Sequence, residues 1–246
     1  MIADNIGVVR QRIAAACLSA GRSVQSITLL AVSKTVGEQA VRDALAAGVS
    51  QFGENYVQEG VDKVNALGDL RGSLEWHMIG PLQANKTRLV AENFDWVHSV
   101  DRLRIAQRLS EQRSGALKPL QVCLQVNVSG EASKSGVAPA DLPELARAVQ
   151  RLPGLRLRGL MSIPEAATDP ALQRRPHRAL RELQDMLNSE GLSLDTLSMG
   201  MTADLEAAIA EGSTILRVGR AIFGARSHVG PAGGNATLLT GTRSGT

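Results

Sequence analysis

The sequence predicts an α/β fold in which eight strands alternate with helices, a (β/α)8 TIM barrel. Short apolar runs recur along the 246 residues, and several are nearly continuous, as expected for strands covered on both faces. Helical patterns separate these runs, which is the order of a parallel sheet with crossover helices. An open, doubly wound sheet is the alternative. No Gly-x-Gly-x-x-Gly follows the first apolar run, which weakens its dinucleotide-binding form.

The expected strands are defined by their apolar runs and by the turn residues between them. The first covers residues 27–34 and ends on Lys34, and the capping signature Thr35-x-x-Glu38 predicts a helix directly after it. The other expected strands cover residues 50–54, 74–80, 95–100, 120–128, 155–163, 196–201 and 215–224.

Helices are expected between the strands, with ends marked by capping residues. Residues 1–21 place apolar side chains at helical spacing and predict an N-terminal amphipathic helix. Further helices are expected to begin at Asn55, at Pro81, after Asp101, near Leu142 and at Asp169–Pro170. Pro176 is expected to kink the last of these or to delay its start, and Gly191 suits its left-handed end.

Composition limits the class of protein. Hydrophobic residues make up 43% and charged residues 21% of the chain, which is ordinary globular usage. The net charge is +3 without blocks of like charge, which argues against binding nucleic acid or a membrane surface. There is no membrane-spanning apolar run, no signal-peptide core and no disulfide framework, so a cytoplasmic protein is expected. We expect one domain over residues 1–228 and a flexible, Gly-, Thr- and Ser-rich tail over 229–246.

Polar clusters fall where the expected strands end, which is where a barrel carries its active residues. The amine of Lys34 can pair with an anion or form a Schiff base with an aldehyde, although an isolated lysine is more often a solvated charge. Thr202 follows the seventh strand and Gly219 the eighth, and these two loops often hold a phosphate in barrels. The sequence therefore indicates an anion site beside Lys34.

Two of these groups have structural alternatives. Thr202 can simply cap a short helix over residues 203–211, and a tight turn explains Gly219 equally well. Asp204 and Glu206 fall in the first turn of that helix, where they would repel a phosphate unless they point away. The phosphate site therefore depends on where these two carboxylates lie.

Other polar residues also have structural readings. Asn55 on its own is more typical of a helix cap than of a ligand. Arg217 could bind a carboxylate inside the barrel, and Glu54 could be that partner or face solvent. His77 and His98 end adjacent strands, but two histidines do not complete a metal site, so structural roles are expected and no metal is predicted.

Seven stretches share their residue pattern with one known family. They are Ala31–Lys34, Phe52–Glu59, Trp76–Lys86, Val126–Gly136, Gly159–Ile163, Leu197–Thr202 with Asp204 and Glu206, and Arg217–Arg226. Together they lie between residues 27 and 226, nearly the whole chain. In these stretches the sequence resembles the pyridoxal phosphate homeostasis proteins, the YggS-type family.

The resemblance implies a single barrel like the N-terminal domain of alanine racemase, with pyridoxal 5′-phosphate (PLP) held on Lys34 as a Schiff base. It further implies a role for five other residues. Thr202 and the backbone of Gly219 and Arg220 would hold the phosphate, Arg217 would face the pyridine nitrogen, and Asn55 would lie near the cofactor. Two positions depart from the family pattern: Thr202 stands where serine is common, and Arg220 stands where a small hydroxyl residue is frequent.

The family likeness also implies a role inside the cell. A cationic arginine disfavours protonation of the ring nitrogen, which makes the ring a weak electron sink. We therefore expect a non-catalytic protein of intracellular PLP homeostasis that stores, delivers or buffers PLP, with no catalytic residues. PLP-requiring apo-enzymes are the expected recipients, Lys86 or Lys134 could offer a transient second site, and a monomer is expected.

Two other functions stay open. A small PLP-dependent amino-acid racemase needs acid–base groups on both faces of the substrate, and the chain has a single tyrosine, Tyr56. A barrel that binds phosphorylated metabolites would use Lys34 as a plain charge. The second of these predicts a colourless protein, and a Schiff base predicts a yellow one.

Overall fold

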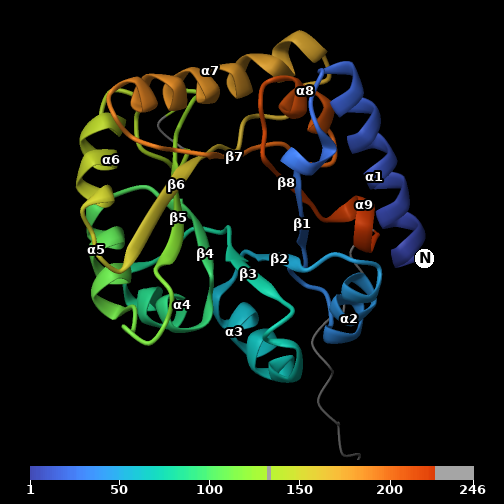
Figure 1. Cartoon of the computed structure of the whole chain (residues 1–246), viewed down its shortest axis with the longest axis horizontal. Helices are drawn as coiled ribbons and strands as arrows, with labels where there is room; N and C mark the ends of the chain where they lie inside the picture. Colours follow the sequence, from blue (N-terminus) through green and yellow to red (C-terminus); the bar gives the residue numbers. More distant parts are fainter. Residues whose placement is uncertain (132–133, 225–246) are drawn as a thin grey trace, which may run out of the picture.

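Eight parallel strands close into a barrel, as the sequence predicts (Figure 1). They are β1 (Thr28–Val32), β2 (Gln51–Glu54), β3 (Glu75–Met78), β4 (Trp96–Val100), β5 (Leu120–Gln125), β6 (Leu155–Met161), β7 (Thr196–Ser198) and β8 (Ile215–Val218). Each strand pairs with the next along the chain, and β8 pairs with β1 to complete the ring. The barrel prediction is therefore confirmed, and the open sheet is wrong.

This computed structural model describes residues 1–131 and 134–224. The expected tail over residues 229–246 lies outside the described residues, so the domain boundary at residue 228 stays a prediction. Within the described part, no helix combines the length and the apolar character that crossing a membrane requires. Cys17 and Cys123 are both free and buried.

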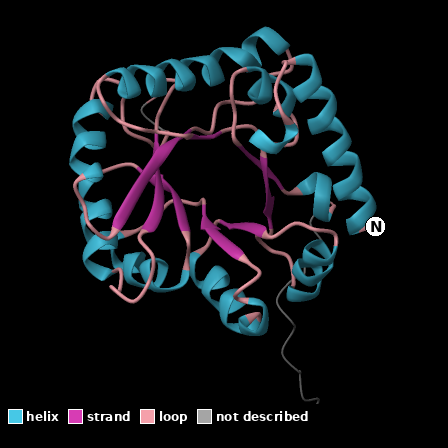
Figure 2. Ribbon diagram, in the orientation of Figure 1, coloured by secondary structure: helices cyan, strands magenta, loops and turns pink. Residues whose placement is uncertain are grey.

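Helices surround the barrel on its outside (Figure 2). They are α1 (Ile2–Ser19), α2 (Glu38–Ala46), α3 (Val57–Ala66), α4 (Thr87–Asn93), α5 (Leu103–Gln112), α6 (Leu142–Gln150), α7 (Pro170–Ser189), α8 (Leu205–Ala210) and α9 (Arg220–Phe223). The N-terminal helix α1 packs against α8 and α9. It therefore braces the two segments that follow β7 and β8.

Alternate residues of the strands face two separate apolar layers. Leu216 belongs to the larger layer, between the strands and the helices, whereas its neighbour Ile215 belongs to a smaller cluster inside the barrel. The inner cluster consists of Leu30, Ile79, Trp96, Cys123, Met161 and Ile215. His98 and Arg217 lie two residues after members of this cluster, so their side chains also face the interior of the barrel.

The predicted start of α2 is wrong. The helix begins at Glu38 with Gly37 before it, and Thr35 has a positive φ of 63°. The N–H of Thr35 donates instead to the carboxylate of Glu59 in α3. A tertiary hydrogen bond has therefore replaced the local capping box that Thr35 and Glu38 would form.

Other predicted ends differ as well. Pro81 does not begin a helix, because the chain continues through a single 3-10 turn (Ala84–Lys86) before α4 starts at Thr87. The predicted strand over 215–224 ends at Val218 and α9 follows it. The carbonyl of Ile222 in α9 accepts a 2.8 Å hydrogen bond from Asn5 in α1. α7 runs without interruption through Pro176, so the delayed start is wrong.

The start of α7 at Pro170 agrees with the sequence. Asp169 caps it by accepting hydrogen bonds from the N–H groups of Ala171 and Leu172, at 2.8 and 3.0 Å. Gly191 has a φ of 97°, which is the left-handed conformation expected after the helix. Both ends of this helix were therefore predictable from the capping residues in the sequence.

Candidate functional site

Four adjacent strands bring the predicted site residues to one arc of the barrel rim. Lys34 follows β1, Asn55 follows β2, Thr202 follows β7, and Gly219 and Arg220 follow β8. In the closed ring β7, β8, β1 and β2 are consecutive neighbours, and all run parallel. A Cβ on Gly219 would lie 3.2 Å from the carbonyl oxygen of Val32, so this glycine approaches the end of β1 closely.

Lys34 is partly exposed, in a turn directly after the buried Ser33. Ser33 belongs to a mostly buried polar group with Glu54, Glu59 and Lys63, which we call the Lys63 cluster. Nζ of Lys63 donates to the carbonyl oxygen of Ser33 at 2.5 Å, to Oε1 of Glu54 at 2.8 Å and to Oε1 of Glu59 at 2.7 Å. Helix α3 therefore fixes the backbone of the turn that carries Lys34.

Glu54 is fully buried inside the Lys63 cluster. Its Oε1 also accepts a 2.6 Å hydrogen bond from Oγ of Ser33, whereas its Oε2 has no hydrogen-bond partner. Burial raises the pKa of Glu54, and the Lys63 ammonium opposes this without cancelling it. Glu54 therefore neither faces solvent nor pairs with Arg217, so both sequence-based readings of this residue are wrong.

Arg217 lies inside the barrel and is only 4% exposed. Its Nη1 donates to the carbonyl oxygen and Oγ of Ser198 at 2.6 and 2.8 Å, and its Nη2 donates to the carbonyl oxygen of Ser162 at 2.8 Å. Burial lowers the pKa of Arg217 to about 10, so the guanidinium is still cationic at neutral pH. Its partners are oxygens of β7 and of the residue after β6, so the alternative in which Arg217 binds a carboxylate is wrong.

His77 and His98 are buried and joined to each other, with 2.9 Å between Nδ1 of His77 and Nε2 of His98. Burial, reinforced by the nearby His77 and Arg217, lowers the pKa of His98 well below its ordinary value, so this ring is neutral. No group of three or more His, Cys, Asp or Glu side chains in the described ranges could hold a metal ion.

Thr202 does not cap a helix, which corrects that reading of the sequence. α8 begins at Leu205, and the residue before it is Asp204, whose side chain does not cap the helix. The backbone carbonyl of Thr202 instead accepts a 3.0 Å hydrogen bond from Arg12 of α1. Asn55 likewise does not cap α3, because the residue that precedes that helix is Tyr56. Both polar side chains are therefore free of the structural role that the sequence offered for them.

Asp204 and Glu206, the two carboxylates that would repel a phosphate near Thr202, both have partners in the structure. Glu206 accepts two hydrogen bonds from Arg12, both 2.9 Å long. Oδ2 of Asp204 lies 3.0 Å from Nε2 of His177, and its Oδ1 accepts from the N–H of Met201 at 2.7 Å. Each carboxylate is therefore held by hydrogen-bond donors of its own, which answers the objection raised by the sequence.

Asp204 predicts a pH-dependent contribution to stability. Burial works against its ionisation, but the hydrogen bonds from His177 and Met201 outweigh burial and lower its pKa in the folded protein. A depressed carboxyl pKa favours folding above the unfolded value, and this contribution is lost as the pH falls through the folded value. We expect Asp204→Asn to lose about 2 kcal/mol of unfolding free energy at pH 7 and a smaller amount at pH 3, which lies below the ordinary carboxyl value.

Urea unfolding at both pH values measures this difference, with Asp185→Asn on the exposed part of α7 as the control. The control is expected to change stability by less than about 0.5 kcal/mol at either pH. A deficit of Asp204→Asn that is equal at pH 7 and pH 3 would contradict the assigned role of the carboxylate.

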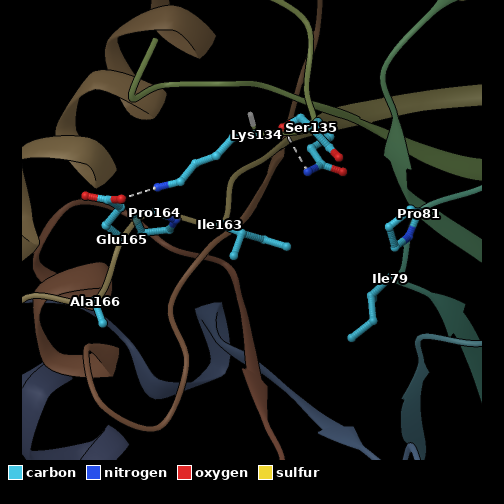
Figure 3. A pocket seen from close by; sticks show the side chains of 9 residues that line it. Ile79, Pro81, Lys134, Ser135, Ile163, Pro164, Glu165 and Ala166 are labelled. Carbon is cyan, nitrogen blue, oxygen red and sulfur yellow. Dashed lines mark hydrogen bonds and ion pairs between the residues drawn. The ribbon is translucent and has the colours of Figure 1, made fainter. Parts of the chain in front are cut away.

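A cavity of about 620 Å³ opens near the ends of β3, β5 and β6 (Figure 3). Its lining residues are Ile79, Pro81, Gln125, Lys134, Ser135, Ile163, Pro164, Glu165 and Ala166. Nζ of Lys134 lies 3.0 Å from Oε1 of Glu165. None of the six predicted site residues lines this cavity or the second one, of about 820 Å³.

Sequence reasoning missed the side chains that support the site. Lys63 was not singled out, although its spacing from Glu59 is that of a helical ion pair, and only the fold brings Ser33 and Glu54 to it. Ser198 lies within one of the matched stretches, but nothing in the sequence signals that its hydroxyl meets both His98 and Arg217. Such contacts join residues up to 100 positions apart.

Comparisons with known proteins show the family of this chain. A family model described as "Alanine racemase, N-terminal domain" matches residues 8–227. Proteins described as "Pyridoxal phosphate homeostasis protein" are 60% identical over 231 residues in Pseudomonas aeruginosa and 54% identical over 228 residues in Escherichia coli K12. These alignments cover 94% and 92% of this chain and 98% and 97% of the relatives.

Solved structures agree at the level of the fold. PipY of Synechococcus elongatus, solved with PLP bound, is 36% identical with a TM-score of 0.80, and the match covers 91% of this chain and 100% of PipY. Alanine racemase of Corynebacterium glutamicum is 18% identical with a TM-score of 0.68, over 90% of this chain and 59% of the racemase. The racemase match supports the fold alone.

Proposed function

Because the chain belongs to the pyridoxal phosphate homeostasis protein family, we propose that it binds PLP through Lys34 and takes part in PLP homeostasis without substantial catalysis. The observation that carries the proposal is the structure of PipY, a relative with PLP bound. PLP would supply an aldehyde that reacts reversibly with an amine, and a phosphate that anchors it.

The residues on this arc of the rim suit such a ligand. The amine of Lys34 is partly exposed. Thr202 offers a hydroxyl after β7, and Gly219 and Arg220 follow the neighbouring strand β8. Among the described residues, Arg217 uses three of the five N–H donors that an arginine carries. The remaining donors can meet an unprotonated pyridine nitrogen. Asn55 follows β2, two strands along the ring from β8, and would lie near the cofactor.

The electrostatics favour holding PLP over transforming substrates with it. Arg217 is buried, cationic and surrounded by carbonyl oxygens, so a proton on a facing ring nitrogen would be repelled. A ring without that proton stabilises carbanions poorly. We therefore propose storage, delivery or buffering of PLP, with PLP-requiring apo-enzymes as recipients. The monomeric state, the cytoplasmic location and the single domain over residues 1–228 stay predictions.

Lys34→Ala tests the proposal by absorption spectroscopy. Purified wild-type protein mixed with PLP is expected to turn yellow, and Lys34→Ala is expected to show only free PLP, since an alanine cannot form the imine. Lys118→Ala, which removes an exposed lysine between α5 and β5, is the matched control and should bind as wild type does. Lys34→Arg that still binds PLP would favour the reading of Lys34 as a plain charge.

A turnover assay tests the absence of catalysis. Tyr56 is 61% exposed and is the single tyrosine of the sequence, so it is the candidate for a second acid–base group in a racemase. We expect no racemisation of alanine above the rate given by free PLP. Robust racemisation that disappears in Tyr56→Phe would establish the racemase alternative.

A further inference from the structure

A continuous row of polar side chains crosses the interior of the barrel. Nη1 of Arg217 lies 2.8 Å from Oγ of Ser198, and this Oγ lies 2.8 Å from Nδ1 of His98. Nε2 of His98 lies 2.9 Å from Nδ1 of His77, whose Nε2 lies 3.0 Å from Oε1 of Glu75. We call these five residues the Glu75–Arg217 chain. It begins on β3 and β4 and ends on β7 and β8, across the barrel (Figure 1).

The two end groups decide the direction in which the hydrogen bonds of the Glu75–Arg217 chain are donated. A guanidinium can only donate, and a carboxylate can only accept. The hydrogen bond to His77 lowers the pKa of Glu75, so this carboxyl is ionised. Arg217 therefore donates to Ser198 at one end, and Nε2–H of His77 donates to Glu75 at the other.

The middle of the chain follows from the proton of Ser198. Among the described residues, Nδ1 of His98 is the acceptor within reach of this hydroxyl, since the other contact of Oγ is with the donor Arg217. A neutral His98 that accepts at Nδ1 carries its proton on Nε2 and donates it to Nδ1 of His77. His77 then holds its own proton on Nε2, as the contact with Glu75 requires. The assignments from both ends agree.

The Glu75–Arg217 chain connects the buried guanidinium of Arg217 to the carboxylate of Glu75 at its opposite end. None of the carboxylates in the described part of the protein forms an ion pair with Arg217. The other titratable groups that influence it are Asp204, after β7, and Cys123, on β5. Glu75 is 44% exposed at the start of β3, and aligned hydrogen bonds polarise one another in a low-dielectric interior. The negative charge of Glu75 therefore makes Oγ of Ser198 a stronger acceptor for Arg217.

We propose that Glu75, His77, His98 and Ser198 are positioning residues that hold Arg217 in one orientation and in its charged form. This inference rests on the proposed function, because the group that Arg217 serves is the ring nitrogen of PLP. The chain keeps an N–H of Arg217 aimed at that nitrogen and keeps the nitrogen free of a proton. It acts through Arg217 and makes no contact with PLP itself.

The first test needs no cofactor. Nitrogen-15 NMR of histidine-labelled protein reports which ring nitrogen carries the proton, with the signals assigned by His77→Gln and His98→Gln. We expect both rings to be neutral and protonated on Nε2. Ser198→Ala removes the hydroxyl donor and should move the Nδ1 signal of His98. Ser162→Ala is the matched control, because its buried Oγ has no partner and its carbonyl oxygen stays in place.

The second test uses PLP labelled with nitrogen-15 in the ring. In wild-type protein the ring nitrogen is expected to be unprotonated at pH 7. Ser198→Ala should bind PLP about tenfold more weakly and shift the ring nitrogen toward its protonated signal. Glu75→Gln, at the exposed end of the chain, should shift it in the same direction and keeps the test decisive if Ser198→Ala does not fold.

The possible outcomes separate the two proposals. A wild-type protein that fails to bind PLP at Lys34 would overturn the proposed function and, with it, the role of the chain toward the cofactor. Normal PLP binding together with an unchanged ring-nitrogen signal in both variants would overturn only the positioning role proposed for the Glu75–Arg217 chain. A His98 ring protonated on Nδ1 would also overturn it.

Discussion

Replacing Lys63 with methionine is expected to lower the free energy of unfolding by about 3–5 kcal/mol. Methionine approximately keeps the length of the side chain but removes three hydrogen bonds, to Ser33, Glu54 and Glu59. Glu54, which is fully buried and has one oxygen without a partner, then loses the cation that balances it. Urea unfolding at pH 7 measures the loss.

Two further variants show whether this loss comes from the unpaired carboxylate. Lys118→Met alters an exposed lysine and should change stability by less than about 0.5 kcal/mol. Lys63→Met combined with Glu54→Gln should recover part of the loss, because no buried charge is left unpaired. A Lys63→Met protein as stable as Lys118→Met would show that the Lys63 cluster is not coupled to folding.

Gly159→Ala is expected to cost about 3 kcal/mol or more, because the barrel has no space for a side chain there. Gly159 pairs with Thr196 between β6 and β7, and a Cβ at position 159 would lie 1.8 Å from the carbonyl oxygen of Thr196. Since that oxygen belongs to the backbone, the contact can be relieved only by moving a strand. Thermal and urea unfolding measure the effect.

Gly72→Ala is the matched control for this substitution. Gly72 is exposed in the loop between α3 and β3, and a Cβ there would meet nothing within 4 Å. The control should be neutral or slightly stabilising, because alanine restricts the unfolded chain. Equal stabilities of the two variants would mean that β6 and β7 do not approach each other as described.

The barrel was predictable because its determinants are local. Leu120–Gln125 is a nearly continuous apolar run, and such runs mark strands buried on both faces wherever they occur. The ends of elements were less predictable, because tertiary contacts decide them. Thr35 is an example: its sequence spacing fits a capping box, but the carboxylate of Glu59 in the next helix takes its N–H.

The same distinction holds for the site. Lys34 could be singled out because a charged residue closing an apolar strand is visible in the sequence. The partners of Arg217 could not, because Ser162 and Ser198 lie 55 and 19 residues away and are brought together only by the closure of the barrel. The conflict between a phosphate and Asp204 could be raised from sequence alone, but only the fold shows that Asp204 has a hydrogen-bond partner in His177.

Borohydride reduction of the PLP-loaded protein, followed by mass spectrometry of its peptides, tests the central proposal most directly. Reduction converts a reversible imine into a stable amine, so the lysine that carried PLP stays labelled. The account predicts one labelled peptide, the one that contains Lys34. No label, or a label carried mainly by Lys63, Lys86, Lys118 or Lys134, would contradict it.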